Sequence, residues 1–127
     1  MENPKDLKYT KEHEWIKVEN NTAIIGITDF AQETLTDIVF VELPEIGKKV
    51  TQSKTAATIE SVKSVSDIYA PASGEVIEVN KQLKDHPEIV NQDPYGKGWI
   101  FKIKLADKKE LNRLMFAEEY TKTVVNE

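Results

Sequence analysis

Alternating polar and apolar residues recur along this chain and predict short β-strands. Residues 14–19, Glu-Trp-Ile-Lys-Val-Glu, have the period of a half-buried strand, and so do residues 75–79, Glu-Val-Ile-Glu-Val. Asn20-Asn21 predicts a tight turn, after which residues 22–27 return as the second strand of a hairpin. Residues 99–105 show the last clear strand pattern. Several short strands separated by turn residues are typical of an all-β barrel or sandwich, although the pattern does not give their order.

Three segments depart from this alternation. Residues 38–43, Ile-Val-Phe-Val-Glu-Leu, are largely apolar, which predicts a buried strand. Residues 29–35 predict a short helix capped by Thr28-Asp29, with Gln32 as the reciprocal cap. Residues 107–125 open with a capping-box-like Asp-Lys-Lys-Glu, and we expect a helical tail there.

The remaining segments carry weaker signals. Residues 1–6 are expected to be frayed, and the polar residues 80–94 predict a loop with room for one helical turn. Trp15 is expected to anchor the core or a sheet face. His13 has no evident partner in the sequence, so we expect a surface or capping residue rather than a general base. His86 is expected to be solvated.

Composition narrows the class of protein. The chain has 127 residues, which suits a single domain over residues 1–127. It is 39% hydrophobic and 31% charged, as expected for a globular protein, and its net charge of −5 disfavours nucleic acid as a partner. It contains no cysteine, which excludes disulfides and cysteine-ligated metals. Any sulfur chemistry therefore requires an imported cofactor.

The sequence gives no sign of export or of a membrane span. The first residues have neither an apolar core nor an arginine-rich amphipathic pattern, so we expect no targeting peptide. No apolar run is long enough to cross a bilayer. These observations predict a cytoplasmic protein without a membrane partner.

The common catalytic patterns do not occur in the sequence. The serines lack a Gly-x-Ser-x-Gly context, and the five glycines are too dispersed for a phosphate-binding loop. Two separate histidines and scattered acids give no convincing metal site. We therefore expect no catalytic residue and no metal.

One stretch remains as the candidate for chemistry. Residues 60–67 read Glu-Ser-Val-Lys-Ser-Val-Ser-Asp, with β-branched flanks on both sides. The central polar residues suit a turn, since serine hydrogen-bonds its own backbone there. The pattern predicts a β-hairpin with Lys63 at its tip. The chain has sixteen lysines, so Lys63 alone is also consistent with an ordinary surface lysine.

Combined with other segments, this stretch resembles the H-protein family of the glycine cleavage system. The resemblance runs from about residue 8 to residue 121 and follows the family in order and spacing. Its segments are His13-Glu14-Trp15, residues 26–32, residues 37–44, residues 60–67, the Ala-Pro-Ala-Ser-Gly-Glu-Val of residues 70–76, and residues 91–99. At Thr36-Asp37 the family more often has glycine before the acid, which leaves the local turn geometry open.

The resemblance implies a fold and a cofactor. Family members form a barrel-sandwich hybrid of two small antiparallel sheets, with peripheral short helices and a C-terminal helix. The family carries lipoate on the hairpin lysine, so Lys63 is expected to be an N6-lipoyllysine. Biotin carriers use a similar hairpin with methionine on both sides of the lysine. The neighbours here, Val62 and Ser64, favour lipoate.

The resemblance also implies a carrier without catalytic activity of its own. The lipoyl arm would take the aminomethyl group from a pyridoxal-phosphate glycine decarboxylase to an aminomethyltransferase. A dihydrolipoamide dehydrogenase would then reoxidise the arm, which lipoate-attaching enzymes install. By the same resemblance, Glu14 and Asp67 are expected to line a cleft that shelters the loaded arm. The alternative for this pair is that Asp67 shapes the hairpin and Glu14 faces solvent.

Two further alternatives stay open at this point. Some relatives pass octanoyl or lipoyl groups to other lipoate-dependent enzymes, so the chain is also a candidate lipoyl relay protein. General loss of lipoylation in a deletion strain would favour the relay, whereas loss confined to glycine-dependent growth would favour the carrier. The third alternative is a structural β-domain whose Lys63 is unmodified.

Overall fold

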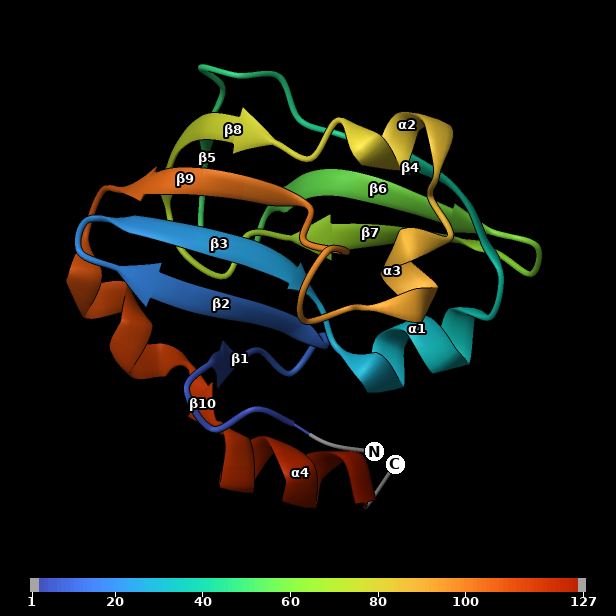
Figure 1. Cartoon of the computed structure of the whole chain (residues 1–127). Helices are drawn as coiled ribbons and strands as arrows, with labels where there is room; N and C mark the ends of the chain where they lie inside the picture. Colours follow the sequence, from blue (N-terminus) through green and yellow to red (C-terminus); the bar gives the residue numbers. More distant parts are fainter. Residues whose placement is uncertain (1–2, 126–127) are drawn as a thin grey trace.

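The computed structural model describes residues 3–125, which form two antiparallel sheets that share one core (Figure 1). The larger sheet has the strand order β10-β1-β2-β3-β9-β8-β5, and the smaller has the order β4-β6-β7. The strands of the larger sheet are β1 (Lys8–Tyr9), β2 (Glu14–Glu19), β3 (Thr22–Ile27), β5 (Lys49–Val50), β8 (Gly74–Val79), β9 (Phe101–Leu105) and β10 (Met115–Phe116). The strands of the smaller sheet are β4 (Ile38–Glu42), β6 (Thr55–Ser61) and β7 (Val65–Tyr69).

The helices lie at the periphery of the sheets (Figure 1). They are α1 (Asp29–Leu35), α2 (Gln82–Asp85), α3 (Ile89–Gln92), the 3-10 helix η1 (Lys108–Arg113) and α4 (Ala117–Val125). The mainly β, two-sheet architecture with a C-terminal helix is the one predicted, although one of its sheets has seven strands and is not small.

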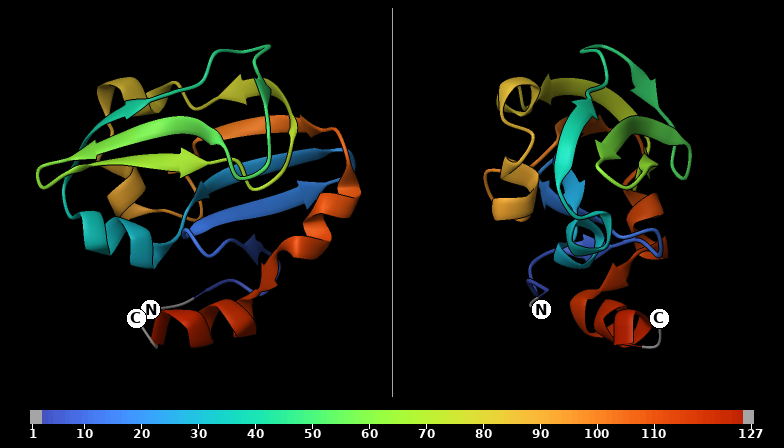
Figure 2. Two further views of the ribbon diagram at one scale, coloured as in Figure 1. Left: turned by 180° about the vertical axis from the view of Figure 1, so that it is seen from behind. Right: turned by 90° about the vertical axis from the view of Figure 1, so that its right-hand side faces the viewer.

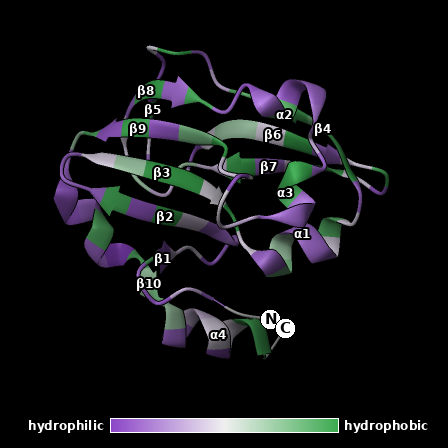
Figure 3. Ribbon diagram, in the orientation of Figure 1, coloured by the Kyte–Doolittle hydropathy of each residue, from purple (hydrophilic) through white to green (hydrophobic). Residues whose placement is uncertain are grey.

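Alternation along the strands builds the core. Polar and apolar bands alternate along β9 (Figure 3), and its buried residues Phe101 and Ile103 face the core that the two sheets share. Strand β2 is buried on both faces at its start, where Ile16 packs in that core and Trp15 packs in a second cluster with Tyr9 and Tyr120. Trp15 is buried as predicted, and its indole Nε1 donates a hydrogen bond to the Pro94 carbonyl at 3.0 Å. Opposite Trp15, a Cβ on Gly26 would lie 2.6 Å from the indole ring, so only glycine allows this close contact.

The prediction for residues 38–43 was only half right. They form strand β4, but β4 is an edge of the three-stranded sheet rather than a buried strand. Ile38 and Val41 point into the core, whereas Val39 and Phe40 are 49% and 50% exposed. A bulge between Ile38 and Phe40 places both Val39 and Phe40 on the surface.

The tail also differs from the prediction. The helix expected over 107–125 is two helices, η1 and α4, separated by the short strand β10. The interruption has a tertiary cause, because β10 pairs with β1 through Lys8↔Phe116 and Tyr9↔Met115. Residues 80–94 contain two helical turns, α2 and α3, where one was expected, and each buries one side chain, Leu83 and Val90.

The first described residues run close to helix α4 (Figure 1). Residues 1–6 were predicted to be frayed, and residues 1 and 2 lie outside the described residues. Asn3 donates a side-chain hydrogen bond to Thr121 at 2.9 Å, and the Pro4 carbonyl accepts one from the Tyr9 hydroxyl at 2.6 Å. Within residues 3–125, no helix has the length and apolar character needed to cross a membrane.

Candidate functional site

The β6–β7 hairpin presents Lys63 in a short, well-bonded turn. The two strands pair from Thr55↔Tyr69 to Glu60↔Val65, and the backbone N–H of Ser61 donates to the Ser64 carbonyl at 2.8 Å. The Ser61 hydroxyl oxygen accepts from the backbone N–H groups of Lys63 and Ser64, each at 3.2 Å. The predicted serine turn is therefore confirmed. Lys63 is exposed, and the tip projects past α1 (Figure 2).

The base of the tip is tied to the segment between α1 and β4. The N–H of Val62 donates to the Asp37 carbonyl at 3.0 Å. Next to this bond, Asn91 of α3 accepts from the Ile38 N–H at 3.0 Å and donates to the Thr36 carbonyl at 2.7 Å. These bonds fix the backbone of the tip to the segment between α1 and β4, and that segment to α3.

Thr36, where this chain departs from the family pattern, takes a backbone conformation that favours glycine. Its φ is 64° and its ψ is −144°, and it ends helix α1. A β-branched side chain is strained in this region of backbone space. The turn is therefore formed without the glycine, and the hydrogen bond from Asn91 helps to hold it.

A cleft of about 550 Å³ lies between the β7 strand, the segment before β2 and helix α1. Both predicted carboxylates line it, Glu14 from β2 and Asp67 from β7. Phe30 and Leu35 of α1 and Ile68 of β7 contribute apolar wall. The fold thus brings together two acids that are far apart in sequence.

Glu14 is a buried carboxyl group, which contradicts the alternative that it faces solvent. It is 2% exposed, and its Oε1 accepts from the Thr10 hydroxyl at 2.5 Å. Its Oε2 accepts from the backbone N–H of Tyr69 at 3.2 Å. Burial raises the pKa of Glu14 to about 7, opposed in part by these two hydrogen bonds and assisted by the nearby charge of Glu12. Glu14 is therefore poised to gain or lose a proton near neutral pH.

Asp67 is exposed and lies at the rim of the same cleft. Register places it in one row with Thr58 and Glu42 across the smaller sheet. The neighbouring row contains the buried residues Val41 and Ile59, so the row of Asp67 faces outward. The two carboxylates therefore differ in kind, since one is buried and one is solvated.

His13 is the cleft residue whose environment the sequence did not predict. It is half-buried rather than fully exposed, and its Nδ1 lies 2.8 Å from the hydroxyl of Tyr120. Its ring also packs on Phe30 at 4.7 Å between centroids. The partner is 107 residues away, and no local pattern signals such a contact. His86, by contrast, is exposed as predicted and lies 3.2 Å from Glu88.

Comparison with known proteins agrees with this geometry. The sequence profile described as Glycine cleavage H-protein matches residues 7–127. A glycine cleavage system H protein of Halothermothrix orenii is 58% identical over 122 residues, covering 96% of this chain and 95% of the relative. One from Symbiobacterium thermophilum is 57% identical over 117 residues, covering 92% of this chain and 91% of the relative.

A solved structure is similar along almost the whole chain. The crystal structure of a glycine cleavage system H protein from Mycobacterium marinum superposes with a TM-score of 0.89 at 37% identity. The match covers 97% of this chain and 99% of the solved one. Taken together, the matched profile, the relatives and the shared fold show that this chain belongs to the glycine cleavage H-protein family.

Proposed function

We propose that this chain is the lipoyl-bearing carrier of a glycine cleavage system, with lipoate joined to Lys63 as an amide. The observation that carries the proposal is the hairpin tip, where an exposed lysine stands on a turn held by Ser61 and braced through Asp37. An attaching enzyme that faces sixteen lysines must choose by geometry, and a projecting hairpin tip offers such a signal.

The residues present fit the proposed group. When bound, lipoate supplies a pair of sulfur atoms that take up the aminomethyl unit left after glycine loses CO2 and that are later reoxidised. The chain has no cysteine and so no thiol of its own for such chemistry. Amide formation also removes the charge of Lys63, which lets the arm lie against apolar wall without a large desolvation cost.

The lipoyl arm is long enough to enter the cleft. About twelve bonds from Cα to the far sulfur, at ~1.25 Å each, extend on the order of 15 Å. Asp67 lies four residues from Lys63, which is at most about 14 Å of extended chain. Tyr69, whose N–H binds Glu14, lies six residues away, at most about 22 Å of extended chain. Asp67 is thus within reach of the arm.

We further propose that Glu14 and Asp67 hold the cationic cargo in the cleft. A protonated amine about 4 Å from a carboxylate has a Coulomb energy of ~4 kcal/mol near a protein surface before desolvation, and much less as net gain. Even a net ~1.4 kcal/mol would shift the bound fraction tenfold. Above a pH of about 7, where Glu14 is mostly ionised, its low exposure supports the stronger interaction, since water screens a buried charge less.

In this proposal the bond-breaking steps belong to the enzymes of the system. These are a pyridoxal-phosphate glycine decarboxylase, an aminomethyltransferase and a dihydrolipoamide dehydrogenase, with a lipoate-attaching enzyme that installs the arm. The chain itself shelters the arm and presents it. An exposed tip beside a sheltered cleft supports both tasks.

Attachment is tested by peptide mass mapping after treatment with lipoate, ATP and a lipoate-attaching enzyme. We expect one modified peptide, containing Lys63. Comparable modification at Lys54 or Lys81 would contradict the geometric argument. In a deletion strain, loss of glycine cleavage with intact lipoylation of other enzymes is expected, whereas general loss of lipoylation would point to a relay protein.

Sheltering is tested by loading the carrier and timing cargo loss in buffer without partner enzymes. Glu14→Gln and Asp67→Asn are compared with the unmutated chain, with folding and lipoylation checked for each. Faster loss is expected. Loss at the unmutated rate in both variants would exclude these two carboxylates as the holding groups while leaving the attachment at Lys63 untouched.

A further inference from the structure

Tyr120 of helix α4 is a buried residue at the meeting point of three segments. It has no exposed surface, and its ring stacks on Tyr9 at 4.7 Å with an interplanar angle of 8°. Its hydroxyl lies 2.8 Å from His13 Nδ1 and 2.7 Å from the hydroxyl of Thr28. Neither Tyr120 nor any other residue of α4 lines the cleft. Both of its hydroxyl's partners, however, belong to the segments that form the cleft walls.

Thr28 connects Tyr120 to helix α1. Its hydroxyl oxygen accepts from the Ala31 N–H at 3.2 Å and so caps the helix that carries Phe30 and Ala31 along the cleft. Its own N–H donates to the His13 carbonyl at 3.0 Å. Thr28 therefore joins two walls of the cleft, the segment that contains His13 and helix α1. Its hydroxyl also contacts that of Tyr120.

The hydroxyls of Thr28 and Tyr120 lie 2.7 Å apart, and either oxygen can be the donor of this bond. Thr28 is fully buried, and its hydroxyl oxygen also accepts from the Ala31 N–H. When the Thr28 hydroxyl donates to the Tyr120 oxygen, the proton of Tyr120 is available to His13 Nδ1, and a neutral His13 then carries its own proton on Nε2. In this arrangement the imidazole, which packs on Phe30, has one tautomer.

We propose that Tyr120 is a positioning residue for the arm cleft, so that the C-terminal helix sets the shape of a cleft it does not line. The proposal deepens the proposed function and rests on it for its consequence in the loaded carrier. One part of the proposal does not require a lipoyl group. This part is that the Tyr120 hydroxyl sets the orientation of His13 and supports the cap of α1.

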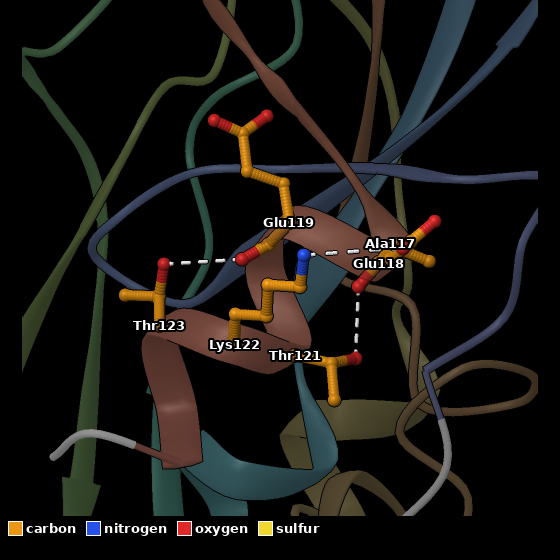
Figure 4. A network of polar contacts seen from close by, with 6 residues as sticks. All are labelled: Ala117, Glu118, Glu119, Thr121, Lys122 and Thr123. Atoms are coloured by element: carbon orange, nitrogen blue, oxygen red, sulfur yellow. Dashed lines mark hydrogen bonds and ion pairs between the residues drawn. The ribbon is translucent and has the colours of Figure 1, made fainter.

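The decisive variant is Tyr120→Phe, which removes the hydroxyl and keeps the stacked ring. Its matched control is Thr123→Val on the same helix. Figure 4 shows that the hydroxyls of Thr121 and Thr123 turn back to the helix itself, to the carbonyls of Ala117 and Glu119. The Thr123 hydroxyl otherwise contacts only Met115 Sδ among the described residues, so its removal leaves the cleft walls unaltered.

Two measurements use the unloaded protein. Nitrogen-15 NMR of the histidine rings should show His13 with its proton on Nε2 in the unmutated chain and in Thr123→Val, and a loss of that preference in Tyr120→Phe. Amide exchange at Ala31 should accelerate roughly fivefold in Tyr120→Phe, as expected when a helix cap is weakened. An unchanged tautomer together with unchanged exchange at Ala31 would overturn the proposal.

A third measurement uses the loaded carrier below its melting transition. Cargo loss should be at least threefold faster in Tyr120→Phe and unchanged in Thr123→Val. If Glu14→Gln speeds the loss and Tyr120→Phe does not, the inference fails and the proposed function stands. If neither variant changes the rate, the cleft itself is not the shelter. His13→Asn, which suits the φ of 72° at this position, serves as a second variant should Tyr120→Phe not fold.

Discussion

The hairpin tip and the cleft beside it are built in opposite ways. The turn of the tip is mostly local: Ser61, Lys63 and Ser64 hydrogen-bond one another within four residues, the Val62 N–H makes the one distant bond described above, to Asp37, and the lysine is exposed. The cleft is assembled from distant segments, with Glu14 bonded to a strand 55 residues away and His13 to a helix 107 residues away. Glu14 is almost completely buried.

Function and stability are therefore related differently in the two regions. A side chain at the tip makes few contacts with the fold, so its chemistry can change without a change in folding. A cleft residue such as Glu14 has been desolvated by the fold, so its chemistry and its contribution to stability change together. Substitutions in the two regions test that separation.

The largest expected effect is the loss of all loading in Lys63→Ala. Because Lys63 is exposed, the free energy of unfolding should change by less than about 0.5 kcal/mol. Intact mass after treatment with a lipoate-attaching enzyme and urea unfolding measure the two quantities. Lys81→Ala, another exposed lysine, should load normally. A large fall in stability of Lys63→Ala would mean that the tip lysine is structural.

Glu14→Gln should change the pH dependence of stability. The folded pKa of Glu14, about 7, lies above its ordinary value of 4.5, so folding favours the protonated form. This contribution is complete below pH 4.5 and is lost as pH rises through 7. The unmutated chain should therefore lose up to about 3 kcal/mol relative to Glu14→Gln between those limits.

Urea unfolding of both chains at several pH values measures this difference. The other titrating groups are common to both chains and largely cancel. A constant offset is also expected, because a glutamine amide cannot accept both the Thr10 and the Tyr69 hydrogen bonds as the carboxylate does. A difference that does not vary with pH would show that Glu14 titrates as a solvated acid.

The sequence predicted what is local and missed what is tertiary. The position of strand β2 and the serine turn at Ser61 follow from neighbouring residues, and both were predicted. The half-buried alternation expected along β2 was wrong, because the C-terminal helix covers Trp15 on its other face. The apolar run of β4 looked buried because periodicity does not reveal that a strand lies at a sheet edge, where Val39 and Phe40 face outward. The tail was predicted as continuous helix because nothing near Phe116 signals its pairing with Lys8.

The residues of the candidate site divide in the same way. Lys63 stands inside its own motif, so its place at a hairpin tip was predictable. Resemblance to the family suggested Glu14 and Asp67 together, and only the fold distinguishes the buried acid from the exposed one. The contact between His13 and Tyr120 depends on where the C-terminal helix packs, which no periodicity in either segment encodes.

Thr36→Gly, in the segment that holds the hairpin tip, should raise the free energy of unfolding by about 1 kcal/mol. Removing the side chain relieves a strained backbone conformation that costs about 1–3 kcal/mol, offset by the greater freedom of glycine in the unfolded chain. Thermal or urea unfolding measures the gain, and loading of Lys63 should be unaffected. Glu33→Gly, in the exposed middle of α1, should instead destabilise by about 1 kcal/mol. Destabilisation by Thr36→Gly would mean that Thr36 is not strained.

The smallest effect is expected from Asp67→Asn, because a solvated carboxylate holds a cation weakly. An exposed ion pair contributes about 0.2–1 kcal/mol, so cargo loss from the loaded carrier should accelerate only about 1.4-fold to fivefold. The effect should also shrink at about 1 M salt, where the screening length is about 3 Å, whereas the effect of Glu14→Gln should persist because the charge is buried.

Glu60→Gln is the matched control. Glu60 is exposed on the same outer face of the smaller sheet and pairs with Val65, but it does not line the cleft. Its rate of cargo loss should equal that of the unmutated chain. If Asp67→Asn matched Glu14→Gln in size and in resistance to salt, Asp67 would act from within the cleft, and the contrast between the two carboxylates would be wrong.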